Sequence, residues 1–145
     1  MVHRRDIKTK RGFTLIELLV VILILAVLAA MIVPKLVGRA EDAKVSAARS
    51  SLSALGRMLE TFRLDNGRYP TTEEGLQALR EAPSDAANWK GPYTTKPIED
   101  DPWGMPYQYE FPGAEGDDSY LLYSFGKDGV EGGEGHAADL IESGA

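Results

Sequence analysis

An uninterrupted apolar run near the N-terminus constrains this chain more than any other feature. Residues 18–33 are all apolar, and Thr14 and Glu17 are the only polar residues between Phe13 and Val33. A helix rises 1.5 Å per residue, so about 20 such residues cross the hydrocarbon core of a bilayer. The many Leu, Ile, Val and Phe side chains favour insertion by more than one carboxylate opposes it. The sequence therefore predicts a membrane-spanning helix over residues 13–33.

Basic residues precede this span and set its expected orientation. Residues 1–12 hold five Lys or Arg and one Asp. Positive charge stays on the cytoplasmic side, so we expect residues 34–145 to lie on the opposite side of the membrane. A cleavable secretory signal is the competing interpretation. It is disfavoured because the apolar run continues past the candidate small residues for cleavage, which lie at positions 26, 29 and 30.

The helical pattern continues beyond the span. Pro34 is expected to kink this helix rather than end it. Apolar residues then recur at steps of three and four, which marks one buried helical face. They are Leu52, Leu55, Leu59 and Phe62. A helix over about residues 13–64 would be roughly 78 Å long, too long for so small a domain, so half of it must pack against lipid or other subunits.

The remainder of the chain predicts a small sheet. Residues 71–79 read as a short helix, since Thr71 and Glu74 have the spacing of a capping box. Residues 82–106 contain five prolines and are expected to form an ordered loop. Aromatic and polar residues alternate over 107–111, and an apolar return strand follows over 119–124. The fold class is therefore α+β, with a long N-terminal spine helix on a small antiparallel sheet.

Composition excludes several functions. The chain has no cysteine, which removes disulfides, thiol catalysis and cysteine zinc sites. Residues 71–145 hold sixteen acidic and four basic residues, a balance that disfavours nucleic acid as a partner and suits a hard cation. A membrane-anchored enzyme is the alternative from another functional class, but no Ser/His/Asp set, phosphate-binding loop or paired-histidine zinc spacing supports it.

The segment from Phe125 to Leu140 is the best candidate for a ligand site. It is rich in glycine and carries four carboxylates. Glycine allows sharp turns that point carbonyls inward, and Ca²⁺ takes six to eight oxygens at about 2.3–2.6 Å. A solvated acidic loop is the alternative, and these residue types alone favour it.

Residues 10–21, Lys-Arg-Gly-Phe-Thr-Leu-Ile-Glu-Leu-Leu-Val-Val, resemble the class III signal of type IV pilins and pseudopilins. The resemblance implies that a prepilin peptidase cuts between Gly12 and Phe13 and methylates the new N-terminus at Phe13. It also implies that Glu17 pairs with the α-amino group of a neighbouring subunit. The alternative for Glu17 is an incidental polar residue near the membrane interface.

Three further segments resemble the major pseudopilin family of type II secretion systems. They are Asn66-Gly67-x-Tyr69-Pro70-Thr71-Thr72, Asp101-Pro102-Trp103-Gly104, and the series from Ser124 and Asp128-Gly129 to Ala138-Asp139-Leu140. The resemblance implies that the C-terminal loop binds calcium, which stabilises the subunit. It assigns Asp128 and Asp139 as side-chain ligands and Phe125 and Val130 as carbonyl donors. Some members have an oxygen-bearing side chain where this chain has Gly133 and His136, and we expect His136 to be solvated.

The same resemblance implies a division of the chain and a function. Residues 1–12 would be a cleaved leader, 13–33 the transmembrane and filament-core helix, and 34–145 a periplasmic domain. The chain would be a single-pass protein of the bacterial inner membrane that polymerises into a pseudopilus, with a prepilin peptidase, minor pseudopilins and an inner-membrane platform as partners. The alternative is a type IV pilin or a minor pseudopilin. Type IV pilins usually carry a C-terminal cysteine pair, and minor pseudopilins usually lack this loop.

Overall fold

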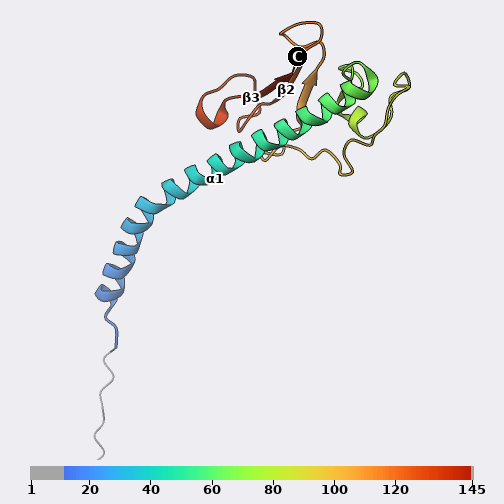
Figure 1. Cartoon of the computed structure of the whole chain (residues 1–145). Coiled ribbons are helices and arrows are strands. Elements are labelled where there is room, and N and C mark those ends of the chain that lie inside the picture. Colours follow the sequence, from blue (N-terminus) through green and yellow to red (C-terminus); the bar gives the residue numbers. More distant parts are fainter. Residues whose placement is uncertain (1–11, 145) are drawn as a thin grey trace, which may run out of the picture. The chain divides into compact units, whose positions relative to one another are not determined.

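The computed structural model of the chain describes residues 12–144, apart from the side chains of residues 33–37. Almost all of the predicted leader therefore lies outside the described residues. The elements follow in the order α1 (Leu15–Asn66), the 3-10 helix η1 (Gly75–Leu79), β1 (Gln108–Glu110), β2 (Tyr120–Ser124), the 3-10 helix η2 (Gly135–Ala137) and β3 (Leu140–Gly144) (Figure 1).

Helix α1 runs through the predicted span and well beyond it. Pro34 lies inside α1, so the helix does not end there, as the sequence predicts. The helix ends at Asn66, because Gly67 adopts a φ of 75° and donates its N–H to the carbonyl of Arg63 at 2.7 Å. The chain divides into two units, one ending at Arg39 and the other beginning at Ala40, and each unit contains part of α1.

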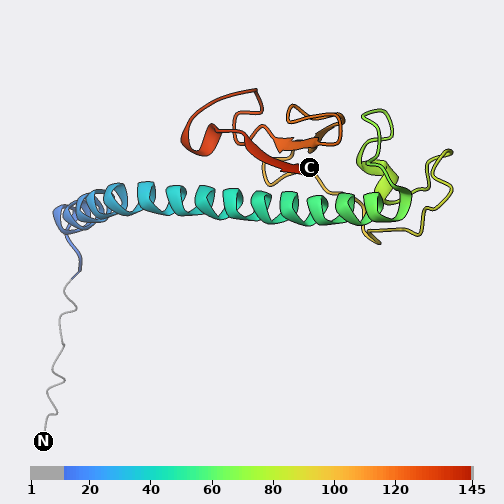
Figure 2. The same ribbon diagram turned by 45° about the horizontal axis from the view of Figure 1, so that its top comes forward.

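The second unit contains a three-stranded antiparallel sheet in the order β1-β2-β3. Tyr109 pairs with Leu122, and Leu122 pairs on its other side with Glu142. Figures 1 and 2 show β2 and β3 alongside the second half of α1. Strands β1 and β2 confirm the strands expected from the sequence. Strand β3 was not expected, and the predicted helix over 71–79 is a 3-10 helix confined to its last five residues.

The core lies between α1 and the inner face of the sheet. The four helical residues that the periodicity predicted, Leu52, Leu55, Leu59 and Phe62, are all buried. Burial alternates along β2, so Tyr120 and Leu122 face this core. Gly56 lets the helix and sheet approach closely, because a Cβ there would lie 2.9 Å from the Tyr120 hydroxyl.

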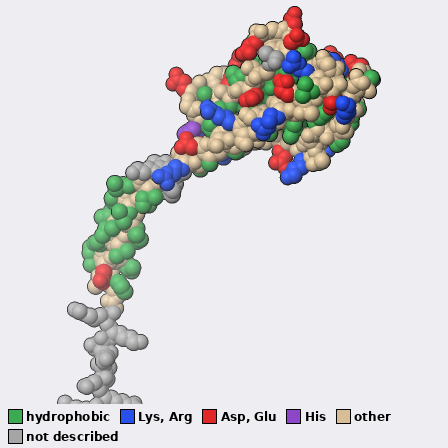
Figure 3. Space-filling view, viewed as in Figure 1, with side chains coloured by type: hydrophobic (Ala, Val, Ile, Leu, Met, Phe, Trp, Pro, Cys, Tyr) green, Lys and Arg blue, Asp and Glu red, His purple; other side chains and the backbone are tan. Residues whose placement is uncertain are grey.

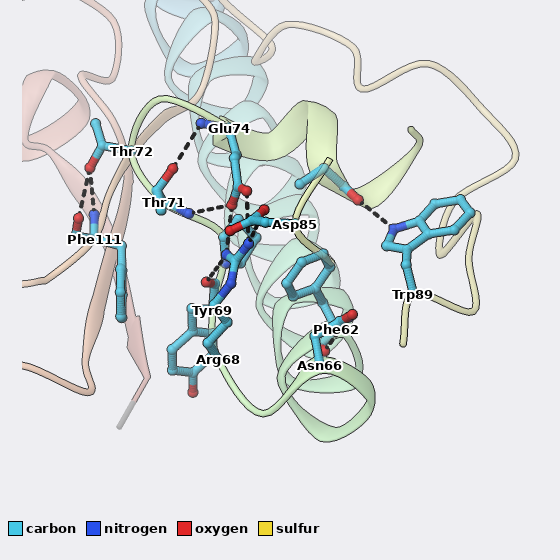
Figure 4. Close-up of polar contacts among 12 residues, drawn as sticks. Phe62, Asn66, Arg68, Tyr69, Thr71, Thr72, Glu74, Asp85, Trp89 and Phe111 are labelled. Atoms are coloured by element: carbon cyan, nitrogen blue, oxygen red, sulfur yellow. Dashed lines mark hydrogen bonds and ion pairs between the residues drawn. The ribbon is translucent and has the colours of Figure 1, made fainter. Parts of the chain in front are cut away.

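Arg68, which follows α1, forms ion pairs on both sides of the short helix η1. Glu74 immediately precedes η1, and Asp85 lies in the loop that follows it. Its guanidinium contacts Glu74 at 2.7 and 2.8 Å and Asp85 at 2.7 Å (Figure 4). Thr71 and Glu74 bond reciprocally, the Thr71 N–H to the carboxylate at 2.8 Å and the Glu74 N–H to the hydroxyl at 3.2 Å. The predicted capping box is thus present, and it precedes η1 (Gly75–Leu79).

Candidate assembly helix and metal-binding loop

The first half of α1 presents a continuous apolar surface. The window Leu15–Ile32 is long and apolar enough to cross a membrane, and none of it is buried. Leu15 is 82% exposed and Met31 is 68% exposed. Figure 3 shows these side chains covering the helix. So large an apolar surface marks a site that lipid or another protein covers.

Glu17 forms reciprocal hydrogen bonds with Thr14 at the start of α1. The Thr14 N–H donates to its carboxylate at 3.4 Å, and the Glu17 N–H donates to the Thr14 hydroxyl at 3.2 Å. These contacts satisfy two of the N–H groups that a helix leaves unpaired at its N-terminus, where negative charge is also favoured. Sequence reasoning missed this capping box, although the Thr-x-x-Glu spacing is the one it recognised at Thr71. Glu17 therefore has a structural partner within its own chain.

The candidate metal loop connects β2 to β3. Its ends are joined where Ser124 pairs with Leu140, and further out the Lys127 N–H donates to the carbonyl of His136 at 3.3 Å. Gly133 allows the tight return of the chain, because it has a φ of 85° and a Cβ would lie 2.3 Å from the Ala137 carbonyl oxygen. Asp128 and Asp139 thus belong to opposite arms of one closed loop.

The four predicted ligand residues differ in their surroundings. One oxygen of Asp139 accepts the Gly132 N–H at 2.9 Å, while the other is buried without a hydrogen-bond partner. Asp128 is exposed and accepts the Val130 N–H at 3.3 Å. Phe125 is half-buried directly after β2, and Val130 is exposed. A buried carboxylate oxygen without a donor is costly, and a cation would satisfy it.

Side chains alone do not complete a metal site. Within residues 12–144, no group of three or more His, Cys, Asp or Glu side chains converges on one point. A cation here would need backbone carbonyls or water beside Asp128 and Asp139, and Ca²⁺ accepts such a mixed oxygen set. Glu131 lines the same surface hollow as Asp139 and Phe125, and so offers a further oxygen that sequence reasoning did not single out.

The loop also contacts the second half of α1. His136, expected to be solvated, keeps 40% of its side chain exposed, but it also places its Nε2 2.8 Å from Asp42, a contact that the sequence did not predict. The reason is tertiary, because Asp42 lies 94 residues earlier in the sequence. Glu41 lies beside it and accepts the Trp103 indole N–H at 3.1 Å, with the Lys127 ammonium 3.6 Å away. The pKa of Glu41 lies below its usual value, mainly because of the hydrogen bond from the Trp103 indole and to a smaller extent because of the positive charge of Lys127.

Comparisons with known proteins identify the class and the family of this chain. Residues 7–33 match the model of the prokaryotic N-terminal methylation motif, so the chain belongs to the class of proteins that carry this motif. Residues 35–143 match the model of protein G of the type II secretion system. The chain belongs to this type II secretion system protein G family.

Individual relatives cover nearly the whole chain. Type II secretion system core protein G of Pseudomonas aeruginosa is 43% identical over 136 residues, 92% of this chain and 94% of the relative. The protein of the same name from Vibrio cholerae is 40% identical over 138 residues, 94% of this chain and 93% of the relative. The major pseudopilin of the type 2 secretion system of enterohaemorrhagic Escherichia coli is a similar solved structure, with a TM-score of 0.61 and 38% identity over 74% of this chain and 93% of that one.

Family membership confirms the resemblance inferred from the sequence. It makes the chain a structural subunit rather than an enzyme. The likeness to a solved major pseudopilin supports the interpretation as a major pseudopilin over the alternatives of a type IV pilin or a minor pseudopilin. The long helix on a small antiparallel sheet is likewise the predicted fold.

Proposed function

We propose that this chain polymerises through the apolar half of α1 into the pseudopilus of a type II secretion system, which drives export of folded proteins across the outer membrane. The observation that carries the proposal is the window Leu15–Ile32, none of which is buried. Lipid covers this surface while the subunit resides in the inner membrane. When the subunit leaves the bilayer, the same helices of other copies offer an apolar surface of matching length. Burial of these side chains then supplies the free energy of association.

The N-terminus of the mature subunit is the second part of the proposal. The match of residues 7–33 to a methylation motif supports cleavage between Gly12 and Phe13 by a prepilin peptidase, with methylation of Phe13. Cleavage creates an α-amino group close to Glu17 in sequence. In the filament Glu17 pairs with the amino group of a neighbouring copy, which neutralises both charges in an apolar surrounding. Removing one partner of a buried pair costs about 3–5 kcal/mol.

The remaining partners and the location follow from the same proposal. The basic leader keeps the N-terminus in the cytoplasm, and residues 34–145 reside in the periplasm. Minor pseudopilins and an inner-membrane platform are the proposed assembly partners. Nucleic acid is not expected, since the distal half of the chain is strongly acidic.

The C-terminal loop is proposed to bind calcium. Asp128 and Asp139 would supply carboxylate oxygens, and Phe125 and Val130 would supply carbonyl oxygens. The buried, unpartnered oxygen of Asp139 supports this assignment. Bound Ca²⁺ would supply positive charge that neutralises the carboxylates and holds both arms of the loop together. The chain itself contributes the glycine turns and the contacts of the loop with α1.

Two substitutions at Glu17 test the assembly proposal. Glu17→Gln keeps an oxygen that accepts the Thr14 N–H, whereas Glu17→Ala removes both the acceptor and the charge. If Glu17 pairs with an amino group, both variants should insert into the membrane and fail to form filaments, measured by membrane fractionation and by shearing and immunoblotting of filaments. Glu73→Gln, on the exposed surface of the second unit, is the control and should assemble normally.

The two variants separate the roles of Glu17. Normal assembly of Glu17→Gln with failure of Glu17→Ala would show that only the capping contact matters, and would refute the intersubunit charge pair. Normal assembly of both would refute any role of Glu17 in polymerisation. Mass spectrometry of the wild-type subunit, with methylated Phe13 as the expected first residue, tests the processing independently.

A further inference from the structure

A buried polar pair, Asp101 and Ser124, joins a distant turn to the start of the C-terminal loop. Asp101 is 4% exposed and Ser124 is fully buried at the end of β2. One oxygen of Asp101 accepts the N–H groups of Trp103 at 3.0 Å and Met105 at 2.9 Å, which holds the turn at 101–105. The other oxygen accepts the hydroxyl of Ser124. Neither residue belongs to the ligand set proposed above.

The Ser124 hydroxyl makes a second contact that reaches the loop. A hydroxyl has one proton to donate, and here it goes to Asp101, which leaves the lone pairs of the oxygen to accept. The N–H of Gly126 donates to this oxygen at 3.2 Å. Asp101 therefore orients Ser124, and Ser124 holds the N–H of Gly126.

This N–H shares its peptide group with the carbonyl of Phe125, a proposed calcium ligand. A peptide group is planar and trans, so fixing the direction of its N–H fixes its C=O in the opposite direction. Gly126 is confined further, because its φ is 67° and a Cβ would lie 2.8 Å from the carbonyl oxygen of Ala138, next to Asp139. The orientation of the 125–126 peptide is thus determined by buried contacts on its N–H side.

We propose that Asp101 and Ser124 are positioning residues of the metal-binding loop, which act by aiming the Phe125 carbonyl as a ligand. This inference rests on the calcium site proposed above. Groups that orient a metal ligand without touching the metal typically change affinity by 10–100-fold when they are removed. The pair would hold the carbonyl in its binding orientation before the cation arrives, so that less ordering accompanies binding.

Ser119 provides a matched control for a purely structural role. It is also buried, at 2% exposure, and it immediately precedes the same strand, β2 (Tyr120–Ser124). Its hydroxyl donates to the carbonyl of Gly116 at 2.7 Å, in the turn at the other end of β2 from the loop. Ser119→Ala and Ser124→Ala each remove one buried hydroxyl, but only Ser124→Ala frees the 125–126 peptide.

The experiment compares these variants in the full-length chain in detergent micelles. Calcium affinity is measured by calorimetric titration with CaCl₂, and thermal unfolding is followed in EDTA. We expect Ser124→Ala to bind calcium about tenfold more weakly or worse, and Ser119→Ala to bind like the wild type. In EDTA, where no metal is bound, Ser124→Ala should lose more stability than Ser119→Ala, because it leaves one oxygen of the buried Asp101 carboxylate without its donor. Affinities are therefore compared at a temperature where both variants are folded.

Each outcome decides between the proposals. Wild-type affinity in a folded Ser124→Ala variant would overturn the positioning role and leave the calcium site standing. If Ser124→Ala does not fold, Asp101→Asn keeps an oxygen for the turn but presents an amide NH₂ to Ser124, and wild-type affinity in that variant would likewise refute the inference. Absence of calcium binding by the wild-type chain would refute the calcium site, and this inference with it.

Discussion

The ion pair between Arg68 and Glu74 makes the stability of the folded domain depend on pH. Hydrogen bonds from Arg68 lower the pKa of Glu74 from 4.5 to about 2. A carboxyl whose pKa is lower in the folded chain stabilises the fold above its unfolded pKa, and this contribution is lost as the pH falls from about 4.5 towards 2. The shift alone corresponds to at most ~3 kcal/mol.

Solvent reduces this figure. The side chain of Glu74 is only 18% exposed, but that of Arg68 is 29% exposed, and Asp85, which shares the guanidinium, is 66% exposed. We therefore expect Glu74→Gln to cost about 1–2 kcal/mol at pH 7, because exposed ion pairs are screened. The amide oxygen still accepts the Thr71 N–H, so the capping contact remains and the change reports the charge.

Thermal unfolding of the full-length chain in detergent, followed by circular dichroism from pH 7 to pH 2, measures the effect. One kcal/mol corresponds to about 4–8 °C in Tm for a domain of this size. The difference between wild type and Glu74→Gln should shrink as the pH falls from 4.5 to 2. Glu73→Gln, at the adjacent exposed position, is the control. A difference that stays constant over this pH range, or that Glu73→Gln reproduces, would refute the reasoning.

Three other outcomes are expected. Gly12→Ala should leave the leader attached in intact-mass spectra, and normal processing would contradict the proposed cleavage site. Asp128→Ala combined with Asp139→Ala should abolish the rise in Tm that calcium produces while leaving Tm in EDTA close to wild type, whereas an undiminished calcium response would eliminate the site. Leu59→Ala should lower the free energy of unfolding in urea by about 2–5 kcal/mol, because Leu59 is fully buried. Ile141→Ala, at a position that is 61% exposed, is the control and should change this free energy little. Equal losses in the two variants would contradict the assigned core.

Local sequence patterns were sufficient to predict those helices and strands whose structure depends mainly on their own residues. The apolar run and the repeat from Leu52 to Phe62 predicted α1, because helical periodicity reflects which face is buried. The alternation before Pro112 and the apolar run ending at Ser124 predicted β1 and β2 for the same reason. The motif around Gly12 and Glu17 indicated the class of pilins and pseudopilins, since leader, glycine and glutamate are close in sequence. The further segments around Asn66, Asp101 and Asp128 indicated the major pseudopilin family.

Four features depended on contacts beyond a single helix or strand. Strand β3 is short and half-exposed, and it exists because its backbone pairs with β2. The contact of His136 with Asp42 and the hydrogen bond from Ser124 to Asp101 form only when α1, the turn at 101–105 and the sheet pack together. Which oxygen of Asp139 is left buried and unpaired is likewise set by the closed loop. The sequence by itself determined the elements and the family, because short-range periodicity and spacing encode them. Only the tertiary structure decided which polar groups meet, because hydrogen bonds between distant segments depend on how those segments pack.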